Sequence, residues 1–220
     1  MGKITILEST TKNPITMIGQ MAGICYGADT DDSLKNYQRG MNCIKSQHGR
    51  TFEFPDVHMK IEGYSARVIR EWYTHIGCLP TRLQASTRYI DYTDFQYITP
   101  PTIKINDEAN VLWNSMMYSI SKTLSELEEL GIPKEDSANG LPLGMTTTIV
   151  DKRNLRNLID MSHNRKCKRA YWEFRELFGN IELELANYSE EWQWIVGNLF
   201  EPKCKYLGKC PEEKGCQNAK

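Results

Sequence analysis

The sequence lacks the features that mark several large classes of protein. Its 220 residues carry a formal net charge of −1, so no field of one sign draws the chain to a nucleic acid polymer or a membrane. No apolar run approaches the length of a membrane span, and the N-terminus does not begin as a signal peptide does. The chain has no internal repeat, P-loop or glycine-rich dinucleotide loop. We therefore expect a soluble, cytoplasmic protein.

The cysteines do not form a recognisable framework. There are seven of them, an odd number, and their scatter through the chain indicates reduced thiols and not disulfides. We expect Cys25 to be a small apolar core residue. Cys204, Cys210 and Cys216 are widely and evenly spaced, whereas a zinc site normally needs four ligands with close pairs. The sequence therefore predicts no metal site.

Apolar periodicity predicts several elements of a domain over residues 1–200, followed by a cysteine-containing tail over residues 201–220. Alternation and β-branched residues predict strands at 3–8, 57–61 and 146–150. Spacings of three and four predict helices at 14–25, 31–46, 106–130 and 183–199. In the longest of these helices, the buried face is expected to include Leu112, Met116 and Leu124.

The stretch from residue 61 to residue 92 is dense in side chains that bind anions and orient rings. Val68, Trp72 and Ile76 recur every four residues, which predicts one buried helical face ending at Gly77. Residues 86–89 have the pattern of an entry to a strand. Arginines brought together by a helix end, a loop and a strand suit phosphate, because the guanidinium fork matches its oxygens. A solvated helix face with scattered surface arginines accounts for the same pattern.

Particular motifs of this chain resemble those of the flavin-dependent thymidylate synthases. The matching segments are Ile61-Glu62-Gly63, Ser86-Thr87-Arg88-Tyr89, Leu141-Pro142-Leu143 and the helical stretch with Asn154, Arg156 and Arg165. The family's Arg-His-Arg is replaced by Thr74-His75-Ile76, so only the histidine is kept. An arginine that often precedes Leu-Pro-Leu falls on Ala138. The resemblance covers most of the chain.

The resemblance implies an α+β fold, with a twisted, mainly antiparallel sheet packed with long helices. It implies FAD as cofactor, NADPH and methylenetetrahydrofolate as co-substrates, and a homotetramer with active sites at subunit interfaces. The reaction would methylate dUMP at C5 to give dTMP. Arg165 would act catalytically by polarising the uracil ring. The residues implied for nucleotide binding are Glu71, Gln84, Ser86, Arg88 and Arg165. Those implied for flavin binding are Glu53, His75, Asn154, Arg156 and Asp160.

The departures from the family pattern leave three functions open. Three cationic donors are missing, each worth about 1.5–3 kcal/mol when hydrogen bonded, and Arg50, Arg70 or Arg82 could replace some of them. The chain could therefore be a thymidylate synthase with relocated arginines. It could instead methylate or hydroxymethylate another pyrimidine nucleotide such as dCMP, since acids and amides distinguish cytosine from uracil. A non-catalytic nucleotide-binding paralogue is the third interpretation.

Overall fold

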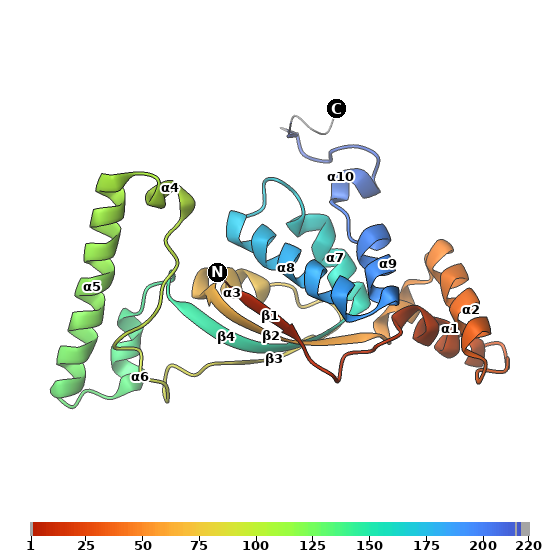
Figure 1. Ribbon diagram of the computed structural model, residues 1–220, viewed down its shortest axis with the longest axis horizontal. Helices are drawn as coiled ribbons and strands as arrows, with labels where there is room; N and C mark the ends of the chain where they lie inside the picture. Colours follow the sequence, from red (N-terminus) through yellow and green to blue (C-terminus); the bar gives the residue numbers. More distant parts are fainter. Residues whose placement is uncertain (1, 214, 217–220) are drawn as a thin grey trace. The chain divides into compact units, whose positions relative to one another are not determined.

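A four-stranded antiparallel sheet is present in the computed structural model, which describes residues 2–213, 215 and 216 (Figure 1). The strand order is β1-β2-β4-β3. The strands are β1 (Lys3–Ile6), β2 (Asp56–Ser65), β3 (Thr81–Gln84) and β4 (Thr146–Asn154). The α+β class is confirmed, and so are the three strands expected from their sequence patterns. β3 is not among the predicted elements.

The described residues form two compact units, and each is considered by itself. The first unit holds residues 2–3, 61–72 and 83–149, and the second holds 4–60, 73–82, 150–213, 215 and 216. The single domain expected over residues 1–200 stays a prediction. Within the described ranges, no helix is long and apolar enough to cross a membrane.

The first unit is built around its longest helix. Its helical elements are α3 (Ala66–Trp72), α4 (Pro101–Lys104), α5 (Asp107–Glu129), α6 (Lys134–Ser137) and the 3-10 turn η2 (Ala138–Gly140). Asn106 begins α5 by accepting a hydrogen bond from the Ala109 amide at 3.0 Å, and Gly131, with φ +76°, follows the end of the helix. The long helix is therefore confirmed with its ends.

The buried face of α5 agrees with the predicted one at Leu124 and differs from it at Leu112 and Met116. Met117 and Leu124 are buried with Phe95 and Met145, while Leu112 is 72 % exposed. Met116, also expected inside, is largely exposed. Two sets of apolar residues on α5 recur with the helical period of 3.6, one through Leu112 and Met116 and the other through Trp113 and Met117. The sequence alone does not show which set is buried. The set that carries Trp113 is the one that packs into the core.

The second unit packs helices around a core rich in large apolar side chains. Its helical elements are α1 (Pro14–Ile24), α2 (Ser33–Lys45), the 3-10 turn η1 (Gly49–Glu53), α7 (Leu155–Arg165), α8 (Trp172–Tyr188), α9 (Glu190–Leu199) and α10 (Lys203–Tyr206). The helices expected at 14–25 and 31–46 are confirmed. A Cβ on Gly19 would lie 1.8 Å from the Asn36 carbonyl oxygen, so glycine allows α1 and α2 to touch.

The predicted helix at 183–199 is wrong, because Ser189 interrupts it. Ser189 has an extended backbone (φ −161°, ψ 159°), and its hydroxyl accepts from the Trp192 amide at 3.3 Å. The same hydroxyl donates to the Lys12 carbonyl at 2.7 Å. A serine is well suited to this cap, so α8 ends and α9 begins within two residues.

Two expectations for the stretch 61–92 are also wrong. The helix α3 ends at Trp72, and Ile76 is 66 % exposed. Residues 86–89 form a turn, because the amides of Tyr89 and Ile90 both donate to the Ser86 carbonyl. The strand in this region is β3, which precedes the turn.

All seven cysteines are free, as the sequence predicts. Cys25 is exposed and is not the core residue that was expected. The chain leaves α1 at Ile24, and Cys25 begins a turn on the surface. The inward face of α1 is already supplied by Ile15, Ile18 and Ala22.

Candidate functional site

Helix α7 begins and ends at residues that the sequence singled out. The Asn154 side chain caps the helix, because its oxygen accepts from the Asn157 amide at 3.0 Å. Arg165 is the last residue of the helix. The Asn157 side-chain amide donates to the Gly77 carbonyl at 2.7 Å. This bond ties the segment from residue 73 to residue 82 to α7.

That segment brings His75 to Arg165. The Arg165 Nε donates to His75 Nε2 over 2.8 Å, and the Arg165 guanidinium carbon lies 4.3 Å from the centre of the Phe174 ring. The His75 ring meets Phe174 edge to face, with centroids 5.8 Å apart. The guanidinium thus contacts a neutral acceptor and an aromatic face, and these two contacts fix its orientation.

The hydrogen bond from Arg165 requires a neutral His75, since the accepting Nε2 must carry a lone pair. Burial, followed by the charges of Arg165 and Arg153, lowers the pKa of His75 to about 4. The ring is therefore uncharged at neutral pH. A histidine kept neutral in this way positions a cation instead of competing with it.

The depressed pKa predicts a pH-dependent stability. The unfolded chain takes up the proton near the ordinary pKa of 6.5, whereas the folded chain takes it up only near 4. Stability from this ring is therefore complete above pH 6.5 and is lost as the pH falls from 6.5 through 4. Between pH 7 and pH 4, we expect the free energy of unfolding of the wild type to fall by about 1–2 kcal/mol more than that of His75→Gln. This figure is discounted for the solvent around a partly exposed ring.

Urea unfolding at a series of pH values from 7 to 4 measures this difference. Glutamine keeps a hydrogen-bond acceptor but does not titrate, so the other acid-sensitive groups cancel between the two proteins. Parallel pH profiles for the two proteins would contradict a depressed pKa at His75.

A buried ion pair at the end of β4 supports this arrangement. The Arg153 Nε lies 2.6 Å from Asp151 Oδ1 and its Nη2 lies 2.7 Å from Oδ2, and both side chains are fully buried. The Arg153 Nη1 also donates to Asn157 Oδ1 at 2.6 Å. The pair therefore holds the side chain that binds Gly77. None of these three residues was selected from the sequence, although Asp151 and Arg153 lie on the inward face of an alternating strand.

The residues assigned to flavin include a second ion pair. The Arg156 Nη1 lies 2.5 Å from Glu53 Oε1, with side chains 44 % and 26 % exposed. The hydrogen bond that Arg156 donates to the Glu53 carboxylate raises the pKa of Arg156. Asp160 lies one turn further along α7 and is exposed. This pair leaves a half-exposed cation on the first turn of α7, beside the residue that caps the helix.

The residues assigned to the nucleotide, apart from Arg165, lie in the first unit. Arg88 Nε donates to Glu135 at 3.0 Å, and the Arg88 amide donates to the Ser86 hydroxyl at 3.2 Å. The Gln84 side chain donates to the Thr147 hydroxyl at 3.3 Å. Glu71 is half-buried on α3. The turn therefore brings Ser86 and Arg88 together, with an acidic partner for the arginine.

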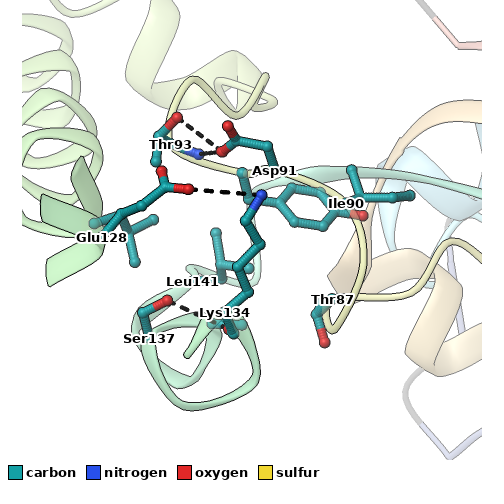
Figure 2. A pocket seen from close by; sticks show the side chains of 11 residues that line it. Thr87, Ile90, Asp91, Thr93, Glu128, Lys134, Ser137 and Leu141 are labelled. Atoms are coloured by element: carbon teal, nitrogen blue, oxygen red, sulfur yellow. Dashed lines mark hydrogen bonds and ion pairs between the residues drawn. The ribbon is translucent and has the colours of Figure 1, made fainter. Parts of the chain in front are cut away.

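A small pocket lies beside this turn, and its volume of about 20 Å³ has room for about one water. Figure 2 shows its lining, with Thr87 on one side and Lys134 extending towards Glu128. The Lys134 Nζ is 3.6 Å from Glu128 Oε1. Ala138, where the family often has arginine, also lines the pocket. Lys134 thus places a cation in the same pocket lining as Ala138, the position at which the family often has an arginine.

The other candidate replacements have partners of their own. Arg82 donates to the Tyr73 carbonyl at 3.0 Å and lies 4.4 Å from the centre of the Tyr73 ring. Arg50 is 3.7 Å from Glu53. Arg70 is exposed on α3. Of these three arginines, Arg82 is the one whose contacts hold the segment that carries His75.

The fold is that of a flavin-dependent thymidylate synthase. The structure of such an enzyme from Helicobacter pylori, complexed with FAD and dUMP, matches with a TM-score of 0.70 at 16 % identity, covering 90 % of this chain and 100 % of the other. The family model described as thymidylate synthase complementing protein matches residues 6–188. The chain belongs to this family, and it is an enzyme of the flavin-dependent methyltransferase type.

Curated relatives agree with this assignment. The flavin-dependent thymidylate synthase of Pyrococcus abyssi is 30 % identical over 171 residues, which is 76 % of this chain and 69 % of the relative. That of Clostridium tetani is 28 % identical over 236 residues and covers 96 % of this chain and 90 % of the relative. That of Thermococcus onnurineus is 29 % identical over 169 residues, 75 % of this chain and 68 % of the relative.

Proposed function

We propose that the protein transfers a one-carbon unit from methylenetetrahydrofolate to C5 of dUMP and forms dTMP, with FAD as cofactor and NADPH as reductant. The observation that carries the proposal is the fixed guanidinium of Arg165, held by His75 and Phe174 at the end of α7. The same helix begins at Asn154 and presents Arg156 on its first turn. Family membership supports the reaction type.

The residues of the second unit fit a dianionic cofactor such as FAD. Arg156 is half-exposed, and its ion pair with Glu53 orients the guanidinium without burying it. The N-terminus of α7 adds its own partial positive charge close by. When bound, the flavin supplies the hydride that completes the methyl group. Arg156 and the capped start of α7 would hold the cofactor, and Glu53 would keep Arg156 in place.

Arg165 would act on the nucleotide. A positioned guanidinium would polarise the uracil ring by stabilising negative charge on its carbonyl oxygens, and this effect is largest where water is excluded. The contacts with His75 and Phe174 hold the Arg165 guanidinium in one orientation. Ser86 and Arg88 would hold the phosphate, which requires Arg88 to exchange Glu135 for the ligand.

Release of tritium from C5-labelled nucleotides tests the proposal. With FAD, NADPH and methylenetetrahydrofolate supplied, we expect release from dUMP, with dTMP as the product. Release from labelled dCMP alone would favour the cytosine nucleotide, whose recognition the acid and amide at Glu71 and Gln84 would serve. Release from neither, by protein that carries flavin, would favour the nucleotide-binding paralogue.

Flavin loading gives a prediction of its own. Purified protein mixed with FAD is expected to retain the absorbance of bound oxidised flavin, and Arg156→Ala is expected to bind FAD about tenfold more weakly, because a charge-assisted hydrogen bond is lost. Lys152→Ala is the matched control, since Lys152 pairs with Asp56 and has no proposed contact with flavin. Equal affinity of wild type and Arg156→Ala, measured by titration, would remove Arg156 from the cofactor site.

We propose further that the enzyme is a homotetramer with active sites at subunit interfaces. The exposed apolar side chains of α5 support this, because Val111, Leu112 and Tyr118 are all exposed on one helix. A second copy of the chain would cover such side chains. Sedimentation equilibrium measures the mass directly, and Leu112→Glu with Tyr118→Glu is expected to lower it. A monomeric wild type would contradict the proposal.

A further inference from the structure

Four cysteines line the same two pockets at the C-terminal end of the second unit. Three come from the tail, Cys204 in α10 together with Cys210 and Cys216, and the fourth is Cys167, two residues beyond the end of α7. All four line one pocket of about 550 Å³, and the same four line another of about 250 Å³. They therefore form the wall that the two pockets share. The remaining cysteines line neither pocket.

The tail has no core that would explain why it folds back. None of the described residues from 201 to 216 is buried. The tail contacts the body of the unit through isolated interactions. Arg169 pairs with Glu212 at 3.0 Å, and the His163 ring stacks on Tyr206 with centroids 4.6 Å apart. A short segment without a core normally needs a disulfide or a metal to fix it, and these thiols are free.

The local sequence suits an anionic metal–thiolate centre. Lysines 166 and 168 flank Cys167, and lysines 203 and 205 flank Cys204. Lys166 and Lys205 already pair with Glu182 and Glu201, so the charges of Lys168 and Lys203 would offset the two negative charges of a divalent ion with four thiolates. A Cβ on Gly215 would lie 3.1 Å from Cys210 Sγ, so glycine lets the chain pass close over this thiol just before Cys216.

We propose that Cys167, Cys204, Cys210 and Cys216 bind one Zn²⁺ in a structural, four-thiolate site. Soft thiolates select zinc over hard divalent ions, and four sulfur ligands close the coordination sphere. Four thiols give up their protons to solvent, and no electron is transferred. Within the described residues, no group of three or more His, Cys, Asp or Glu is already arranged to hold an ion. Binding must therefore draw the tail cysteines onto Cys167, as expected where a metal completes a fold.

The site would fasten the tail to the end of α7. Cys167 lies two residues after Arg165, so the bound ion would restrain the chain immediately beyond the proposed catalytic arginine. The ion itself has no part in the one-carbon transfer. The zinc proposal can therefore be tested independently of the proposed function.

Metal content tests the site on the full-length chain, purified under reducing conditions from medium with added zinc. Elemental analysis is expected to find about one zinc per chain. Cys210→Ser is expected to lose most of it, whereas Cys25→Ser and Cys78→Ser, which replace exposed cysteines outside both pockets, should keep it. Replacement of the ion by Co²⁺ should add thiolate-bound cobalt bands in the red, where oxidised flavin does not absorb.

A measurement on the wild type keeps the test independent of variants that fail to fold. Iodoacetamide labelling, mapped by mass spectrometry, should modify the four thiols several times faster after zinc is removed by a chelator, while Cys25 reacts at an unchanged rate. Zinc-free protein whose four thiols react equally with and without added Zn²⁺ would overturn the proposal. A Cys210–Cys216 disulfide or an iron–sulfur absorbance band in this preparation would overturn it as well.

Discussion

Replacement of Arg165 by alanine is expected to lower kcat/KM for one-carbon transfer by about 100- to 1,000-fold, the usual effect of removing one fixed donor from a developing negative charge. Its guanidinium is held by the 2.8 Å bond to His75 and by the Phe174 ring, so alanine removes a donor whose orientation these contacts fix. The rate is measured by tritium release from the nucleotide that the wild type accepts. Flavin content is measured on each sample, which separates a loss of chemistry from a loss of cofactor.

Two further variants make this test specific. Arg165→Lys keeps the charge but loses the Nε donor and the planar contact with Phe174, so it should recover only part of the rate. Arg175→Ala removes an exposed arginine from α8 and should leave the rate unchanged. An Arg165→Ala protein that keeps its flavin and most of its rate would show that this guanidinium does not act on the reacting ring.

The contact with Arg165 gives a physical reason for the one histidine kept from the family's Arg-His-Arg motif. In this chain Thr74 and Ile76 offer no charge, while His75 offers a neutral nitrogen that accepts from Arg165. A pKa of about 4 keeps that nitrogen unprotonated at neutral pH. The histidine of the motif is sufficient to position Arg165, because the contact with Arg165 involves neither Thr74 nor Ile76.

Much of the local structure could be predicted from the sequence, because caps and periodicity act over a few residues. Asn106, Asp32 and Gly131 stand at ends of helices that the pattern located. The order Asn154, Arg156, Arg165 likewise predicted a helix with functional residues at its start and end, and α7 spans that stretch.

What the sequence did not predict depends on contacts between distant segments. Ile76 fits a helical face, yet the chain leaves α3 at Trp72 and continues to Gly77, whose carbonyl binds Asn157. Cys167 and the tail cysteines line the same pocket only because the chain returns to the end of α7, and this too is a contact between distant segments. The spacing of cysteines within the tail indicates only three ligands, because the fourth, Cys167, lies outside the tail.

Arg153→Met is expected to lower the free energy of unfolding by about 3–5 kcal/mol, because it leaves the Asp151 carboxylate buried without its cation. Both side chains are fully buried, and Arg153 also holds Asn157, so the loss extends to the bond between Asn157 and Gly77. Urea unfolding followed by tryptophan fluorescence measures the change, with the protein concentration held constant.

The double variant Asp151→Leu/Arg153→Met distinguishes two contributions to the free energy of unfolding. One is the destabilisation by a buried carboxylate without its cation, and the other is the stabilisation by the intact ion pair. Replacing both partners by apolar side chains should restore much of the lost stability, because no buried charge then remains. Lys152→Met is the matched control on the same strand, since its pair with Asp56 at 2.8 Å is partly exposed and worth about 0–1 kcal/mol. Suppose that Arg153→Met lowered the free energy of unfolding no more than Lys152→Met. The buried pair would then not be what holds Asn157, nor what holds the segment that carries His75 through the bond between Asn157 and Gly77.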